Sequence, residues 1–128
     1  MDNPSIRCRI AACNEALDDG RSWSFYLLND GNSALTSVVL YSVGYEWGDW
    51  GSSRDVDVRL TGLAPGANAL VWRDDDSGAE TRIDLSLRVT ADGREVTLNF
   101  EFPKLYRQRK LRPVAGLGKS GYTVSTSA

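Results

Sequence analysis

The amino-acid sequence predicts an antiparallel β-sandwich of about seven strands, and three observations support this prediction. Almost every apolar run alternates with polar residues, which is the period of a half-buried strand, and no stretch has convincing helical spacing. Turn signals recur about every 8 to 15 residues, a spacing typical of sandwiches and too short for βαβ units. The chain of 128 residues has the length of one ordinary domain.

The clearest element is a hairpin over residues 82–102. Asp92-Gly93 lies between its two strands and suits a type I′ turn, because both central residues of that turn need a positive φ. Pro103 ends the second strand, since it has no N–H to donate to a ladder. Eight alternating apolar residues are predicted to face the core: Ile83, Leu85, Leu87, Val89, Val96, Leu98, Phe100 and Phe102.

The same alternation predicts five further strands. Residues 35–45 are apolar on both faces, as expected of a central strand. Residues 14–19 are expected to hold at most a single helical turn. Residues 120–128 either fray or add an edge strand through Tyr122 and Val124. The five expected strands lie at about residues 5–12, 23–28, 35–45, 56–60 and 69–72.

Two turn motifs resemble those of a known family. LLNDGNSALTSVVL has an Asn-x-Gly turn between apolar strands, and LTGLAPGANALVW has a Leu-x-Pro-Gly turn between strands. Over residues 22–73 they resemble bacterial immunoglobulin-like modules of the cell-adhesion-related type. The resemblance implies an immunoglobulin-like sandwich that serves as an accessory or binding domain without catalytic residues. The antibody pattern of Cys, Trp and Cys is absent, because both cysteines precede the first Trp.

The formal net charge of −2 hides a separation of charge along the chain. Residues 1–103 carry nine arginines and all 17 carboxylates, a charge of −8, whereas residues 104–128 carry six basic residues and no acid. We expect a sandwich body over residues 1–103 and a basic C-terminal segment over residues 104–128 that is partly packed or frayed. This segment either folds back over the acidic body, stays solvated or docks on an acidic partner. Nucleic acid is disfavoured as a partner, because the body repels phosphate.

The stretch YEWGDWG at residues 45–51 is the most unusual part of the chain, and we expect it in a loop. It holds two of the four tryptophans, and exposed aromatic rings on a loop can stack on sugars or anchor a protein partner. Alternatively, the two tryptophans close one end of the core. We predict binding residues of two kinds, the aromatic anchors Tyr45, Trp47 and Trp50 and the steering charges Arg107, Arg109, Lys110 and Arg112.

Several chemistries are excluded or disfavoured. The chain has no histidine, which removes Ser-His-Asp and Cys-His nucleophiles and the commonest metal ligand. Cys8 and Cys13 are five apart and therefore on opposite faces of a strand, so a disulfide between them is disfavoured. The Gly-Lys-Ser at residues 118–120 lacks the first glycine of a phosphate-binding loop, since Pro113 stands there.

Acidic residues give no better site for catalysis or metal binding. Glu46 and Asp49 are only three residues apart in the same stretch, and one such pair is expected by chance among 17 carboxylates. Asp74, Asp76 and Glu80 do not match the EF-hand pattern, because Gly78 stands where an oxygen ligand is needed. We expect no catalytic residue, no metal and no cofactor.

The sequence therefore predicts a non-enzymatic interaction or structural module that presents its loops and the basic C-terminal segment to a protein partner. Its strand edges are a candidate surface for self-association. The alternative is a carbohydrate-binding module that uses Trp47 and Trp50, with Asp49 or Glu46 accepting hydrogen bonds. No apolar run approaches the roughly 20 residues of a spanning helix. Unpaired thiols and the lack of an apolar leader favour the cytoplasm, although a domain trimmed from a secreted chain would carry the same pattern.

Overall fold

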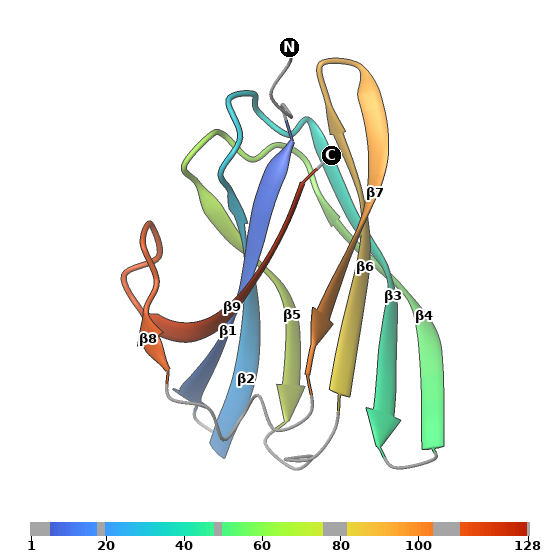
Figure 1. The fold of residues 1–128 in the computed structure, drawn as a ribbon, viewed down its shortest axis with the longest axis vertical. Coiled ribbons are helices and arrows are strands. Elements are labelled where there is room, and N and C mark those ends of the chain that lie inside the picture. The colour runs from blue at the N-terminus through green and yellow to red at the C-terminus, as the bar shows by residue number, and fades with distance from the viewer. Residues whose placement is uncertain (1–5, 18–19, 48–49, 76–81, 104–110, 128) are drawn as a thin grey trace.

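A computed structural model describes residues 6–17, 20–47, 50–75, 82–103 and 111–127 (Figure 1). These residues form nine strands and no helix, so the all-β prediction is confirmed, with two strands more than expected. None of the described segments is a helix that could cross a bilayer. The strands form two antiparallel sheets.

The first sheet has the strand order β5-β2-β1-β9-β8. Residues 14–17 belong to β1, so the single helical turn allowed for residues 14–19 does not form in this part, and residues 18 and 19 lie outside the described residues. Residues 14–17 continue the pairing with β2 as far as Leu17 opposite Gly20, and this pairing outweighs the weak local preference of the sequence. The strands are β1 (Arg7–Leu17), β2 (Gly20–Asn29), β5 (Asn68–Asp75), β8 (Arg112–Pro113) and β9 (Ser120–Ser127).

The second sheet has the strand order β4-β3-β6-β7 and lies face to face with the first (Figure 1). The predicted hairpin is confirmed, because β6 and β7 pair and both turn residues, Asp92 and Gly93, have positive φ. β3 is a central strand, as predicted, and pairs with β4 and β6. The strands are β3 (Ser37–Trp47), β4 (Trp50–Leu60), β6 (Arg82–Ala91) and β7 (Arg94–Phe102).

The main core fills the space between the two sheets. Phe25 of β2 and Phe102 of β7 meet there, with ring centroids 5.2 Å apart in an edge-to-face arrangement. Seven of the eight apolar residues predicted to face the core from β6 and β7 are buried, and the eighth, Val96, is half-buried. Alternation within the strands therefore places one apolar face of each sheet against the other.

The two turn motifs contact one another at one end of the first sheet. The buried side chain of Asn29 donates through Nδ2 to the Leu63 carbonyl oxygen at 2.9 Å and accepts from the Gly31 N–H at 2.9 Å. The Gly66 N–H in turn donates to the Asn29 carbonyl oxygen at 2.8 Å. The Asn-x-Gly and Leu-x-Pro-Gly turns thus form one hydrogen-bonded unit around a buried asparagine.

Residues 111–127, which we call the C-terminal cover, extend the first sheet by the strands β8 and β9, and the loop 114–119 between these strands lies over the outer face of the sheet. Its strand β9 pairs with β1 from Arg7 opposite Ser127 to Ala12 opposite Tyr122. Of the two outcomes expected for this end of the chain, the added strand is correct, and in the sheet it lies between β1 and the short β8. A small second apolar cluster lies under the cover and consists of Ala11, Cys13, Leu28 and Val114.

Candidate functional site

The first candidate site is the hairpin end, which comprises residues 45–47 of β3 and 50–52 of β4. The loop expected over residues 45–51 is wrong for most of this stretch, because β3 continues to Trp47 and β4 begins at Trp50. Tyr45 pairs with Ser52 and Trp47 with Trp50, so the alternation of strand-forming aromatic residues prevails over the glycine and acidic residues between them. Asp49 lies outside the described residues.

The backbone register brings the three predicted aromatic anchors together. Tyr45 and Trp47 are two residues apart on β3, and Trp50 is directly opposite Trp47 on β4. Residues two apart in a strand, and residues directly opposite in an antiparallel pair, share one face. Positions 45, 47 and 50 therefore fall on the same face of the hairpin, which is the face from which Tyr45 packs against the main core. The side chains of Trp47 and Trp50 lie outside the described part of the chain.

Tyr45 links the hairpin end to the first sheet. It is half-buried against the main core, and its hydroxyl donates to Asp74 Oδ1 of β5 at 3.4 Å. Burial and the negative charge of Asp74 both raise the pKa of Tyr45. Beside it, the Arg54 guanidinium lies 5.8 Å from the ring centroid of Trp72. Tyr45 is thus a packed residue at the inner end of the aromatic row.

The predicted charged residues of both candidate surfaces are described only in part. Arg112 is exposed in β8, at the outer edge of the first sheet. Glu46 is exposed in β3, whereas the other acid of its pair, Asp49, falls in a gap of the described chain. The remaining steering charges lie outside the described residues: Arg107, Arg109 and Lys110.

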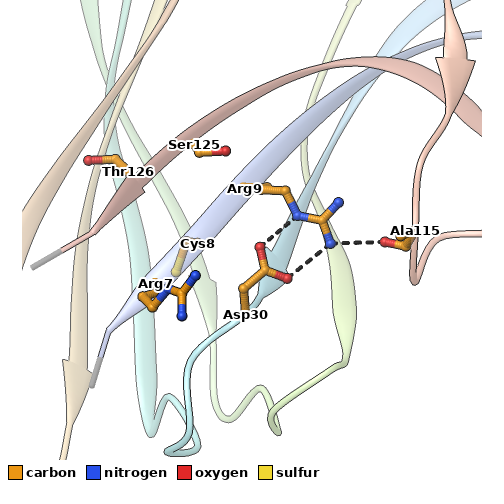
Figure 2. A pocket seen from close by; sticks show the side chains of 7 residues that line it. All are labelled: Arg7, Cys8, Arg9, Asp30, Ala115, Ser125 and Thr126. Atoms are coloured by element: carbon orange, nitrogen blue, oxygen red, sulfur yellow. Dashed lines mark hydrogen bonds and ion pairs between the residues drawn. The ribbon is translucent and has the colours of Figure 1, made fainter. Parts of the chain in front are cut away.

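A hollow of about 530 Å³ on the outer face of the first sheet is a second candidate site (Figure 2). Figure 2 shows the Asp30 carboxylate turned toward the Arg9 guanidinium, with the Ala115 carbonyl beyond it. Arg9 donates to both Asp30 oxygens, at 2.6 and 2.9 Å, and to the Ala115 oxygen at 2.9 Å. These bonds fasten the turn after β2 and the C-terminal cover to β1. The lining residues are Arg7, Cys8, Arg9, Asp30, Ala115, Ser125 and Thr126.

A cluster of Glu15, Tyr26 and Lys119 also holds the C-terminal cover, four residues along the chain from the Ala115 contact. The Lys119 ammonium donates to Glu15 Oε2 and to the Tyr26 hydroxyl, which donates to Glu15 Oε1 at 2.6 Å. Burial opposes the ionisation of Glu15, but hydrogen bonds from Lys119, Tyr26 and Ser24 outweigh it and lower its pKa to about 2. The hydrogen bond to Glu15 is the main cause that raises the pKa of Lys119, which therefore stays charged and is no nucleophile.

Neither cysteine has the properties of a reactive thiol. Cys8 points into the main core and Cys13 into the second cluster, so the predicted placement on opposite faces of one strand is confirmed, and both are unpaired. Burial, with a smaller effect of Asp30, raises the pKa of Cys8 to about 12. Burial and Glu15 raise the pKa of Cys13 to about 11. At neutral pH both thiols are protonated, which makes them poor nucleophiles and poor metal ligands.

The described residues contain no group of three or more cysteine and acidic side chains that could hold a metal ion. Of the three acidic residues considered for calcium, Asp74 lies in β5, whereas Asp76 and Glu80 lie outside the described residues. A hollow of about 330 Å³ at the end of the second sheet is lined by Glu46, Arg82, Glu101 and Pro103. There Arg82 is paired with Asp84 and with Glu101.

Sequence reasoning missed the ion pairs that hold the C-terminal cover. In the sequence Lys119 stands out only as part of a Gly-Lys-Ser motif, and no pattern singles out Arg9 or Glu15. Their partners are separated by up to 106 residues, so no local pattern could have found them. The one available signal is global, namely a basic C-terminal segment opposite an acidic body.

Comparison with protein-family models finds no family that matches the chain. Comparison with curated proteins likewise finds no match.

Proposed function

We propose that this chain is a non-enzymatic protein-interaction module built on an immunoglobulin-like sandwich. The strand order supports the immunoglobulin-like assignment. In that fold strands A, B and E share one sheet, and strands C′, C, F and G share the other. Strands β1, β2 and β5 correspond to A, B and E, and strands β4, β3, β6 and β7 correspond to C′, C, F and G. The hydrogen-bonded unit of the two turn motifs, centred on Asn29, adds support.

The observation that carries the binding role is the row of aromatic positions at the hairpin end. Positions 45, 47 and 50 share one face by register, and Tyr45 is held in place by the core and by Asp74. Aromatic residues bury large areas at a small entropic cost, which makes them common anchors of interfaces. The chemistry of the described residues favours binding over catalysis, since both thiols are buried and Lys119 is held as an ammonium.

The basic residues of the C-terminal segment are proposed to steer an acidic partner toward the module. Arg112 is exposed in β8. Charges at the rim of an interface mainly accelerate association and make it depend on salt. The steering residues Arg107, Arg109, Lys110 and Arg112 therefore raise the association rate, whereas the hairpin end determines how long the complex lasts.

Affinity capture with the full chain tests the anchor role. Partners captured by the wild-type chain and identified by mass spectrometry should be lost with the Trp47→Ala/Trp50→Ala variant. The Tyr41→Ala variant serves as a matched control, because Tyr41 is an aromatic residue of the same strand that lies beside Arg88 on the outer face of the sheet. Circular dichroism should show that all three proteins are folded. Partners retained equally by the double variant would overturn the proposal.

The steering role needs substitution rather than truncation, because deletion of residues 104–128 would remove β9 and the core contacts of Tyr122. Replacement of the four basic residues by glutamine should lower the association rate with a purified partner at least about tenfold at low salt. The dissociation rate should change little. A glycan array with the same tryptophan variants tests the alternative that the chain binds carbohydrate. A sugar signal that is lost in the Trp47→Ala/Trp50→Ala variant, together with no captured protein partner, would favour carbohydrate binding.

A further inference from the structure

Strand β4 forms one edge of the second sheet and is eleven residues long (Figure 1). No other described strand pairs with its outer side, so its outward N–H and C=O groups lack strand partners within the described chain. The register with β3 shifts between Asp55 and Val58, but exposed and half-buried side chains still alternate along this part of β4. A long free edge is a template on which another strand can add through backbone hydrogen bonds. The side chains of β4 then decide which strand fits.

The middle of β4 alternates between charged and apolar side chains. Asp55, Asp57 and Arg59 are exposed on the outer face, and Arg59 Nε lies 2.8 Å from Asp57 Oδ1. Val56 and Val58 are half-buried and pack against the main core. An added strand must therefore place apolar residues opposite the two valines, basic residues opposite the aspartates and an acidic residue opposite the arginine.

This pattern is complementary to itself when two copies pair antiparallel with Asp57 at the centre. Asp55 of each copy then lies opposite Arg59 of the other, and Val56 lies opposite Val58. Opposite residues must share a face, so the register can shift only in steps of two. One such shift places Asp55 opposite Asp57. The other places Asp57 opposite Arg59 but leaves Asp55 without a strand partner and shortens the paired stretch, because β4 ends at Leu60. The single like-charge contact, Asp57 opposite Asp57, is offset by the neighbouring Arg59 of each copy.

Strand β7 forms the other edge of the second sheet, and its charges are not complementary to themselves in this way. The outward residues of β7 are Glu95, Thr97, Asn99 and Glu101, and all four are exposed. Antiparallel self-pairing centred on Leu98 would place Glu95 opposite Glu101, a repulsive contact. In that register the charges of β7 repel a second copy of β7, whereas the charges of β4 attract a second copy of β4.

We propose that the chain forms a two-fold symmetric dimer through antiparallel β4–β4 pairing in this register. The pairing joins the two second sheets into one continuous sheet. It uses residues 54–60, whereas the proposed partner site uses positions 45, 47 and 50, so the two surfaces are distinct. Because the strands are antiparallel, the two hairpin ends point in opposite directions and both stay free for partners.

Sedimentation velocity of the full chain over a concentration series tests the dimer. Asp55→Arg places an arginine opposite Arg59 of the other copy, and Arg59→Asp places an aspartate opposite Asp55. Each variant alone should therefore dimerise at least about tenfold more weakly than wild type. Mixed in equal amounts, the two variants place arginine opposite aspartate at both positions, and the heterodimer should regain an affinity within about threefold of wild type. Glu95→Arg on β7 is the matched control and should leave dimerisation unchanged.

Three results would overturn the proposal. The first is a wild-type chain that stays monomeric at about 1 mM, where even a contact worth roughly 4 kcal/mol would be half-formed. The second is dimerisation of either single variant as strong as that of wild type, and the third is a mixture that does not recover. Circular dichroism of each variant excludes misfolding as the cause. Because Trp47 and Trp50 are unchanged in all these proteins, partner capture can fail or succeed independently of the dimer.

Discussion

The outer faces of the two sheets differ in how they are covered. The first sheet carries the C-terminal cover, which buries Leu28 and Cys13 and is tied down by Arg9 and by Lys119. The second sheet has no such layer among the described residues, and its outer face is polar, with the Arg88 guanidinium 4.1 Å from the Tyr41 ring centroid. The same alternating pattern thus gives a buried second cluster on one sheet and a solvated face on the other.

Truncation of an outward apolar residue should affect the two faces very differently, and this is the largest expected effect. Leu28→Ala leaves a cavity under the C-terminal cover, because Leu28 is only 2 % exposed, and should lower the free energy of unfolding by about 3 kcal/mol. Val39→Ala, on the half-exposed outer face of β3, should cost less than about 1 kcal/mol. Urea denaturation measures both. Equal losses would mean that the cover does not pack on β2.

Substitution of two glycines, one in each sheet, should also affect stability differently. A Cβ at Gly121 of β9 would lie 2.9 Å from the Ala12 carbonyl oxygen and 2.9 Å from Cys13 Sγ, so Gly121→Ala must push β9 away from β1. We expect this substitution to lower the free energy of unfolding by about 2 kcal/mol. At Gly44 of β3 the nearest atom, Asp84 Cβ, is 3.6 Å away, so Gly44→Ala should be neutral or stabilising by up to about 1 kcal/mol. Urea denaturation of both variants checks this, and a neutral Gly121→Ala would contradict the close β1–β9 packing.

The cluster of Glu15, Tyr26 and Lys119 should make the cover sensitive to acid. The folded state lowers the pKa of Glu15 to about 2, so its stabilising effect is complete above the unfolded pKa and is lost as the pH falls from about 5 toward 2. Because the cluster is partly exposed, we expect ionised Glu15 to contribute about 1 kcal/mol to the free energy of unfolding. Chemical denaturation of Glu15→Gln at pH 7 and pH 3 checks this. The difference from wild type should be present at pH 7 and shrink at pH 3, whereas a constant difference would contradict the ionic role.

The exposed pair on β4 should have the smallest effect on the folded monomer. Arg59 and Asp57 are 70 % and 65 % exposed, so Arg59→Gln should change the free energy of unfolding by less than about 0.5 kcal/mol. Thermal unfolding at a concentration where the chain is monomeric measures this. A loss above about 1 kcal/mol would show that this pair stabilises the fold itself rather than selecting the strand that adds to the edge.

The local parts of the fold could be predicted from the sequence. The β6–β7 hairpin follows from alternation and an Asp-Gly turn, and the opposite faces of Cys8 and Cys13 follow from their odd spacing. The same reasoning failed where pairing with a neighbour decides the conformation. Residues 14–17 extend β1 because β2 pairs with them, and Trp47 and Trp50 extend the β3–β4 hairpin.

For the candidate sites, the sequence indicated which residue types were unusual but not how these residues are arranged. The aromatic row at the hairpin end is visible in the sequence as an unusual composition, but its shared face needed the register of β3 and β4. For the C-terminal cover, an added strand was one of two predicted outcomes, but its contacts could not be predicted, because they join residues about a hundred positions apart. Charge separation along the chain indicated attraction between the two parts without indicating Glu15 or Asp30 as the partners.

Hydrogen–deuterium exchange resolved by NMR on the monomer tests the central contrast most directly. The β9 amides that bond to β1 should be protected nearly as well as the buried strands, because the C-terminal cover is part of the first sheet. The β4 amides that face away from β3 should exchange fast, because they belong to a free edge. Fast exchange throughout β9, or strong protection of the outward β4 amides in the monomer, would contradict this account.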